Sequence, residues 1–276
     1  MRTASSLLVV GFLFTSGALA EPNGSVFTMS RPAWRLHVPA GYEPRPEGAY
    51  DLLVHFHGDP ATVQRNVAAS RLNAVVVTAN YNGLSSAYRR PFEEAGLFQT
   101  LLDDVAATLR TYPRFGPKAT RDRLAVSSFS AGYGAVREIL KQPRYVEAID
   151  GVLAADSLYA STAADGTPED EQMAPYKRFA DLAAAGEKTF LLTHTEVPTP
   201  TYESTRDTAD ELLAHLGIEA TAVDQKGRGP LRFTRTATRG RFILWGCPGE
   251  TGDEHMDHFR YLAEWLDALP LAKRGE

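Results

Sequence analysis

The chain has almost no cysteine and, beyond its first twenty residues, no long apolar run. Cys247 is the only cysteine among 276 residues, so one chain cannot form an internal disulfide. No later segment is apolar enough to cross a membrane. The folded protein must therefore be held together by a hydrophobic core, and a chain of this length with 43% hydrophobic residues can bury one.

Positive charge is not in excess either. The formal net charge is −5, which argues against a nucleic-acid-binding protein. The one locally basic stretch covers residues 226–241, and its spacing is typical of the solvated face of a hairpin: Lys226, Arg228, Arg232, Arg235, Arg239 and Arg241. Internal repeats, low-complexity tracts and interdomain linkers are absent from the sequence. We therefore expect one globular domain over residues 21–276.

The N-terminus has the pattern of a secretory signal peptide. Arg2 supplies the positive charge, residues 7–14 form a short apolar segment, and Ala18-Leu19-Ala20 is a small-residue cleavage site. We predict that residues 1–20 are removed and that the exported protein begins at Glu21, without a membrane anchor. A bacterial periplasm or the extracellular space is the predicted location.

Apolar, β-branched segments alternate with helical patterns along the rest of the chain. Strands are expected at 34–38, 51–56, 74–78, 124–126, 150–155, 189–193 and 242–245. Helices are expected at 62–72, 92–109, 135–140, 176–185, 205–216 and 258–269, and a β-hairpin over 220–241. This alternation predicts an α/β fold, with a mostly parallel twisted sheet covered by helices on both faces. Residues 157–188 are too few for a large cap domain.

A serine stands at a sharp turn between a strand and a helix. Residues 128–132 read Ser-Phe-Ser-Ala-Gly, after the apolar run 124–126 and before the helical segment 135–140. A strand, a tight turn with small neighbours and a helix are the layout of a nucleophile elbow, with Ser130 at its tip. Ser128 stands where the usual motif has its first glycine.

Polar residues follow several of the expected strands. Ser130, Asp156 and a histidine after residue 246 appear in the order Ser, Asp, His, and in a parallel sheet these strand ends share one edge. The chain resembles the α/β-hydrolase fold, and within it exported esterase-like serine hydrolases. The resemblance covers nearly all of the mature chain and rests on residues 39–44 (PAGYEP), 53–58 (LVHFHG) and 128–132 (SFSAG).

The resemblance implies a catalytic triad with Ser130 as the nucleophile. Two histidines could be its base, and we favour His255, in the expected loop before the last helix, over His258, one turn inside it. Two carboxylates could orient that base. We favour Asp156, directly at a strand exit, over Glu196 in a Pro/Thr-rich loop.

Two backbone amides would form the oxyanion hole, from Ala131 and from Asp59 in the turn after His57. The expected substrate is a small-molecule or polymer-derived acyl compound, above all a carboxylic ester, with no cofactor. Tyr159, close to Asp156, is the aromatic residue expected near the site.

Two other interpretations remain open at this point. The run His55-x-His57-x-Asp59 matches the start of a dinuclear metal motif, with His194 as a further ligand, although Pro60 stands where that motif needs another ligand. Alternatively, the fold could serve a non-catalytic binding protein. If neither holds, His55 should pack beneath the site and His57 should lie at its rim.

Overall fold

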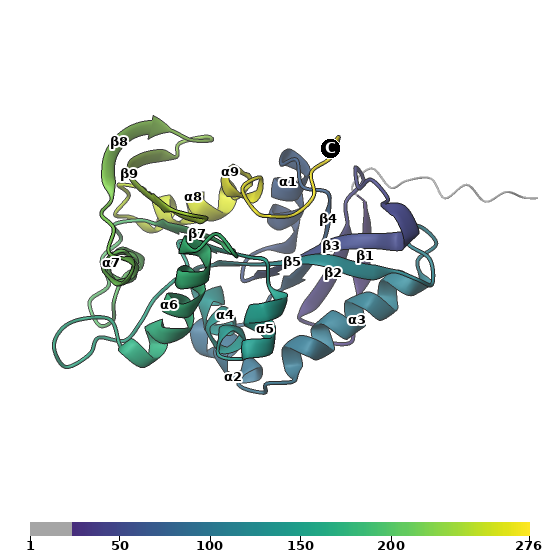
Figure 1. Ribbon diagram of the computed structural model, residues 1–276, viewed down its shortest axis with the longest axis horizontal. Helices are drawn as coiled ribbons and strands as arrows, with labels where there is room; N and C mark the ends of the chain where they lie inside the picture. Colours follow the sequence, from purple (N-terminus) through teal and green to yellow (C-terminus); the bar gives the residue numbers. More distant parts are fainter. Residues whose placement is uncertain (1–23) are drawn as a thin grey trace, which may run out of the picture.

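Residues 24–276, described here by a computed structural model, form a sheet of ten strands with helices around it (Figure 1). The predicted signal peptide lies outside the described residues. The strands are β1 Ser25–Thr28, β2 Trp34–Val38, β3 Ala49–Phe56, β4 Ala74–Ala79, β5 Thr120–Phe129, β6 Gly151–Ala155, β7 Thr189–His194, β8 Thr221–Lys226, β9 Arg232–Arg239 and β10 Phe242–Gly246.

The strand order is β1-β2-β4-β3-β5-β6-β7-β10-β9-β8. The central strands from β4 to β10 all pair in parallel, whereas β1, β2, β8 and β9 pair antiparallel at the two edges. The strands β4, β6 and β7 are buried along their whole length, which explains their continuous apolar runs. The predicted mostly parallel α/β sheet is confirmed.

Helices cover both faces of this sheet (Figure 1). On one face lie α1 Pro60–Ala69, α8 Gly252–Arg260 and α9 Ala263–Leu266; on the other lie α2 Ser85–Phe92, α3 Leu97–Thr111, α4 Tyr133–Leu140, α5 Pro143–Ala148 and α6 Asp170–Ala184. The remaining helix, α7 Thr205–Leu216, packs beside α6. Short 3₁₀ turns occupy Pro46–Gly48 and Ser130–Gly132.

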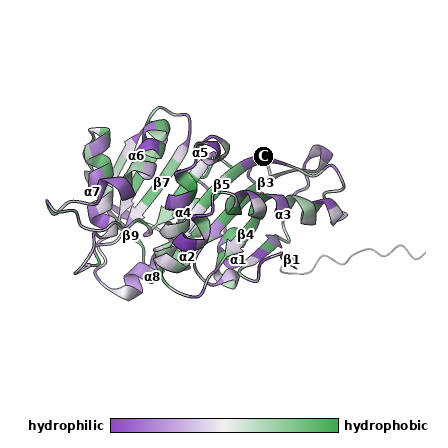
Figure 2. Ribbon diagram, turned by 90° about the horizontal axis from the view of Figure 1, so that it is seen from below, coloured by the Kyte–Doolittle hydropathy of each residue, from purple (hydrophilic) through white to green (hydrophobic). Residues whose placement is uncertain are grey.

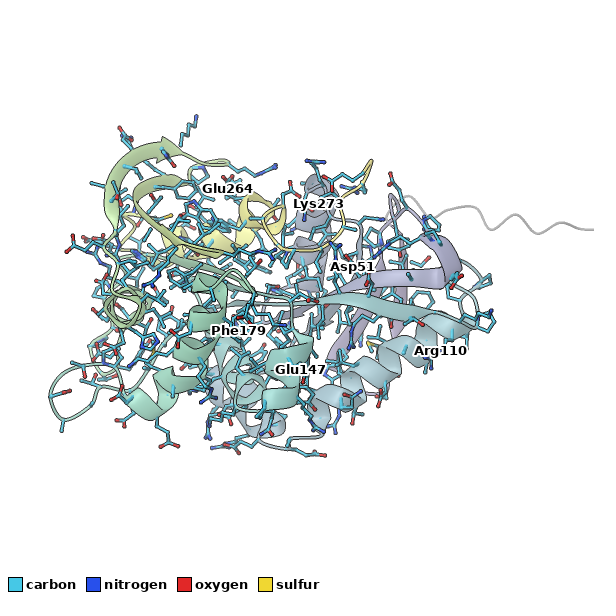
Figure 3. All side chains as sticks on the ribbon, in the orientation of Figure 1. Asp51, Arg110, Glu147, Phe179, Glu264 and Lys273 are labelled. Carbon is cyan, nitrogen blue, oxygen red and sulfur yellow. The ribbon has the colours of Figure 1, made fainter. Side chains whose placement is uncertain are left out.

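Each face of the sheet has its own hydrophobic core. Figure 2 shows the apolar strands between helices whose outer sides are polar. On the α6 face, the ring of Phe179 (Figure 3) meets that of Phe190 on β7 edge-on, at 5.9 Å between centroids. On the opposite face, Trp265 of α9 is fully buried. No large cap domain interrupts the chain between β6 and β7.

Several helix boundaries differ from those predicted, and the short helices α2 and α5 were not predicted. The expected helix 92–109 is α3, which begins only after Gly96, and Phe92 instead ends α2, a helix that the sequence analysis missed. The last predicted helix, 258–269, is divided between α8, which begins at Gly252 and ends at Arg260, and α9. Thr251 is the N-cap of α8 and forms a capping box with Glu254, a Thr-x-x-Glu signal that the sequence did contain.

The predicted hairpin at the sheet edge is present as β8 and β9. Its basic residues are not all solvated, however. Arg232 is exposed, but the Arg235 side chain is only 14% exposed and donates hydrogen bonds to His194 and Asp210. Arg235 is therefore part of the packing between β9, β7 and α7.

Between residues 24 and 276, no helix is long and apolar enough to cross a membrane.

Cys247 is a buried free thiol, and burial, together with the nearby Asp156 carboxylate, raises the pKa of that thiol to about 12. It therefore has none of the thiolate character that a reactive cysteine needs.

Candidate active site

Ser130 occupies a strained turn between β5 and α4. Its φ angle is 45°, a left-handed conformation that side-chain-bearing residues rarely adopt. The turn continues through Ala131 and Gly132 into α4. A Cβ atom at Gly132 would lie 2.3 Å from the carbonyl oxygen of Phe56, so only glycine fits there. This local geometry is the strand, sharp turn and helix that the sequence predicted around Ser130, and we call this turn the elbow.

The serine that replaces the first glycine of the elbow motif has its own partner. Ser128 is buried, and its hydroxyl lies 2.9 Å from that of Ser157. Ser157 in turn donates to the carbonyl oxygen of Ser130 at 2.8 Å. Its one proton is thereby used, so Ser128 is the donor toward Ser157. The unusual residue is thus tied to the backbone of the elbow.

Asp156 follows the neighbouring strand directly. Phe129 pairs with Ala155 across β5 and β6, so Ser130 and Asp156 leave adjacent strands at the same level. Asp156 is fully buried and also has a positive φ, of 44°. Its two carboxylate oxygens accept hydrogen bonds from the amide of Thr195 (2.9 Å), the hydroxyls of Thr195 (2.8 Å) and Thr205, and Nδ1 of His255 (2.6 Å).

These contacts fix the charge of Asp156. Burial alone would raise the pKa of this carboxyl group, but the hydrogen bond from His255 and the nearby histidine charges hold the pKa well below its usual range. Asp156 is therefore ionised at neutral pH, although no part of it reaches solvent.

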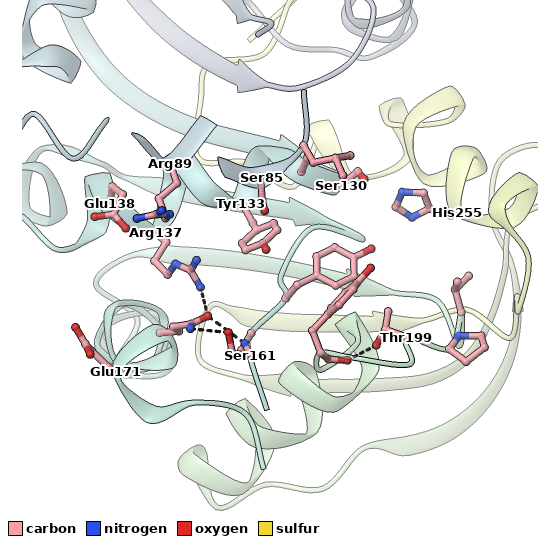
Figure 4. A pocket seen from close by; sticks show the side chains of 18 of the residues that line it. Ser85, Arg89, Ser130, Tyr133, Arg137, Glu138, Ser161, Glu171, Thr199 and His255 are labelled. Carbon is pink, nitrogen blue, oxygen red and sulfur yellow. Dashed lines mark hydrogen bonds between the residues drawn. The ribbon is translucent and has the colours of Figure 1, made fainter. Parts of the chain in front are cut away.

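His255 lies in the first turn of α8, not in the loop where the sequence analysis placed it. Because Asp156 is ionised, Nδ1 of His255 is the donor in the 2.6 Å contact, which leaves Nε2 as the acceptor nitrogen. The imidazole ring stacks on Phe129, the residue before Ser130, at 4.6 Å between centroids. Its side chain is 18% exposed and lines the same cavity as Ser130 (Figure 4).

The two alternative triad residues point elsewhere. His258 is fully buried in the last turns of α8, where Nδ1 lies 2.7 Å from the Thr193 hydroxyl and the ring stacks on Trp265. The Glu196 carboxylate forms an ion pair with Arg206, whereas Asp156 is the carboxylate that contacts His255. The geometry thus favours His255 and Asp156 over both of these residues.

The His55-x-His57-x-Asp59 run does not converge on a metal site. His55 is buried, with Nδ1 2.7 Å from the Ser127 hydroxyl and Nε2 2.9 Å from the carbonyl oxygen of His57, and burial lowers its pKa to about 4. Asp59 is the N-cap of α1. Nowhere in residues 24–276 do three His, Cys, Asp or Glu side chains come together as metal ligands.

His57 is half-buried at the turn after β3. Its Nδ1 lies 2.8 Å from the Tyr88 hydroxyl, and its ring stacks on Phe129 from 6.0 Å. Burial and the neighbouring charge of His255 lower its pKa. His55 is therefore packed in the interior, and His57 lies beside Phe129 in the turn after β3.

The cavity beside Ser130 has a volume of about 760 Å³. Ala131 and Tyr159, two residues expected at the site, line it together with Ser130 and His255, whereas Asp59 does not. The sequence analysis missed several residues here. Thr195 and Thr205, which hold Asp156, carry no motif, and neither does Arg137 of the cavity wall.

Comparison with known proteins gives structural likenesses alone. No protein-family profile and no curated protein sequence matches the chain. Similar solved structures include a feruloyl esterase module from Clostridium thermocellum (11% identity, TM-score 0.45, 93% of each chain covered) and a siderophore hydrolase from Aspergillus nidulans (15%, 0.46, 95% of this chain and 100% of the other). A poly(3-hydroxybutyrate) depolymerase from Bordetella parapertussis is another (17%, 0.46, 87% of each). Likenesses at this level assign no activity.

The strand order, the elbow and the residues at the strand ends are sufficient to define the architecture. The chain has the α/β-hydrolase fold. Its cavity holds Ser130 and His255, and Nδ1 of His255 donates to the buried carboxylate of Asp156. Chemically, such an arrangement can remove a proton from a hydroxyl group and return it to a leaving group.

Proposed function

We propose that the protein is a serine hydrolase that cleaves carboxylic esters through Ser130, His255 and Asp156. The observation that carries the proposal is the 2.6 Å contact between His255 Nδ1 and the buried Asp156 carboxylate, beside the serine of the elbow. A serine hydroxyl is a weak nucleophile unless a base accepts its proton. Asp156 holds the imidazole in the tautomer whose Nε2 can do so.

In the first half of the reaction, Ser130 Oγ attacks the ester carbonyl carbon while its proton passes to Nε2 of His255. The tetrahedral intermediate then collapses. The bond to the leaving alcohol breaks, the alcohol oxygen takes the proton from His255, and an acyl-enzyme remains on Ser130. Asp156 stabilises the imidazolium that exists between these two proton transfers.

In the second half, water replaces the alcohol. His255 removes a proton from water, whose oxygen attacks the acyl carbon, and the proton then returns to Ser130 Oγ as the carboxylic acid leaves. The developing oxyanion would be held by the amide of Ala131, at the start of the turn into α4. Asp59, the other predicted donor, is the N-cap of α1 and does not line the cavity. No cofactor is needed for either step.

The substrate is proposed to be a small-molecule or polymer-derived ester. The predicted removal of residues 1–20 and export to the periplasm or the outside of the cell are part of the same proposal, because they place the protein where such esters would come from the environment. The cavity is bordered by tyrosines, including Tyr159, which suits an apolar or aromatic acyl group.

Labelling with a fluorophosphonate probe tests this function. The purified protein should become covalently labelled, and peptide mapping should place the adduct on Ser130. Dialysis against EDTA should leave hydrolysis of short-chain p-nitrophenyl esters unchanged. Absence of labelling would favour a non-catalytic binding protein, and activity lost to EDTA and restored by zinc would favour a metallohydrolase.

Asp156→Asn should lower kcat by about 10⁴-fold, the loss that the equivalent change causes in a serine protease. An asparagine cannot stabilise the imidazolium, and it offers the wrong hydrogen-bonding pattern to Nδ1. Steady-state kinetics on p-nitrophenyl butyrate measure the effect. Glu196→Gln is the matched control, because Glu196 is bound to Arg206 outside the triad, and should change kcat little. The reverse result would assign the acid to Glu196.

A further inference from the structure

A buried arginine lies in the same cavity as Ser130. Arg137 is on α4, one helical turn beyond Tyr133, and it is only 7% exposed. Its guanidinium lies over the Tyr133 ring, 5.2 Å from the centroid. Residues four apart share one face of a helix, so Tyr133 and Arg137 extend the cavity wall from the elbow along α4 (Figure 4).

The positive charge of Arg137 has no carboxylate partner. None of the ion pairs within residues 24–276 includes it. Its guanidinium donates from Nη1 to Oε1 of Gln172 at 2.7 Å, and this acceptor is a neutral amide. A guanidinium carries five N–H donors, so most of its donor capacity remains for a ligand. Burying an unpaired charge is costly, and such a charge is usually compensated by a partner.

The other charged residues of the wall are paired or exposed. Arg89 pairs with Glu93, and Lys141 pairs with the buried Glu138 at 2.9 Å. Glu171 is exposed at the rim of the cavity. Among these charged residues of the cavity wall, Arg137 is the cation that is both buried and without a carboxylate partner, so it can bind an anion.

The guanidinium is also held in place. The Gln172 side chain that accepts from Arg137 donates through Nε2 to the Ser161 hydroxyl at 2.9 Å, and its Oε1 accepts from the Ser161 amide at 3.1 Å. Gln172 is thus fixed at both ends of its amide group. A guanidinium fixed by such contacts and by an aromatic face loses little conformational freedom when it binds a carboxylate in a paired, fork-like geometry.

Aromatic rings form another part of the wall. Tyr159 packs against Tyr133 at 5.3 Å and against Tyr202 at 5.7 Å between centroids, and all three line the cavity with Ser130 and Arg137. A substrate that reaches from Ser130 to Arg137 would pass these rings with an apolar or aromatic segment.

We propose that Arg137 binds a carboxylate that the ester substrate carries at the end remote from the scissile bond. The substrate class is then an ester with an apolar or aromatic middle and a free acid at its far end. This inference rests on the proposed function, because Ser130 defines the scissile bond. The acid could belong to the acyl group or to the alcohol, and the experiment distinguishes the two.

Two substrate series test the proposal. In one, mono-p-nitrophenyl esters of linear dicarboxylic acids of increasing length carry the acid on the acyl side; in the other, butyrate esters of hydroxyphenyl-alkanoic acids carry it on the alcohol side. Each is compared with its primary amide, which is uncharged. In one series kcat/KM should favour the acid over the amide by about tenfold to a hundredfold, the value of a charge-assisted pair. No preference in either series would overturn the proposal.

Arg137→Gln should remove this preference by raising KM for the acid, with a much smaller effect on the amide. Arg144→Gln is the matched control, because Arg144 also lies over a tyrosine ring, at 4.6 Å, but does not line the cavity; it should keep the preference. If Arg137→Gln does not fold, Arg137→Lys replaces it and should reduce the preference several-fold. A preference unchanged in the folded Arg137 variant contradicts the proposal.

A binding measurement separates this inference from the proposed catalysis. Calorimetry with Ser130→Ala and every member of the two series should show at least one acid bound about tenfold or more tightly than its amide, and Ser130→Ala/Arg137→Gln should lose the difference. If the parent protein hydrolyses none of these esters but the acid still binds more tightly than its amide, the proposed function is wrong and the carboxylate site at Arg137 is supported. Equal binding of acid and amide would overturn the carboxylate site.

Discussion

Ser130→Ala is expected to lower kcat for p-nitrophenyl butyrate by about 10⁶-fold, the loss that removal of the nucleophile causes in a serine protease. The hydroxyls of Ser128 and Ser157 beside Ser130 cannot replace it, because both are buried and hydrogen-bonded to each other. Alanine has the same backbone preferences as serine at φ 45°, so the turn should persist. Steady-state kinetics and a thermal melt measure the two effects.

Ser85→Ala is the matched control for this experiment. Ser85 also lines the cavity, on α2, but has no part in the proposed triad. It should keep kcat within a few-fold of the parent, which would exclude a general effect of losing a hydroxyl from the cavity wall. A Ser130→Ala protein that retained its kcat would refute the acyl-enzyme mechanism.

His255→Ala should be almost as damaging, with kcat again reduced by about 10⁶-fold. Without the imidazole nothing in the site accepts the Ser130 proton, and the buried Asp156 carboxylate loses one of its hydrogen-bond donors. Because that carboxylate is also held by Thr195 and Thr205, the protein should still fold. Kinetics, together with circular dichroism, are the measurement.

His258→Ala provides the contrast on the same helix. His258 packs against Trp265 and contacts Thr193 at full burial, so its removal should create a cavity and lower the free energy of unfolding by about 2 to 4 kcal/mol. At a temperature where the variant is folded, kcat should stay within about tenfold of the parent. If His258→Ala destroyed kcat and His255→Ala did not, the base would have been assigned to the wrong histidine.

The sequence predicted the parts of this site that follow from strand ends. Apolar β-branched runs located the parallel strands, and the side chains directly after them, Ser130 and Asp156, necessarily share one edge of the sheet. His255 was expected in a loop, because the last helix was predicted to begin only at residue 258. The capping box at Thr251 shows that the helix begins earlier, where its first turn carries polar residues.

Other features depend on contacts between residues far apart in the chain. Thr195 and Thr205 hold Asp156, and Gln172 orients Arg137, yet none of these residues has a spacing that sets it apart. Arg235 was expected in solvent because arginine usually is, whereas the structure surrounds it with His194 and Asp210. Such side chains are recognised only when the fold brings their partners together.

The positive φ angles of Ser130 and Asp156 mean that substitutions which increase stability at these positions would remove the proposed activity. Each conformation costs a side-chain-bearing residue about 1 to 3 kcal/mol, and glycine would be relieved of much of it. A screen for heat resistance would therefore select glycine at positions 130 and 156, where the proposed reaction requires serine and aspartate. Selection for stability alone should be kept away from the ends of β5 and β6, and directed to surface positions far from the cavity.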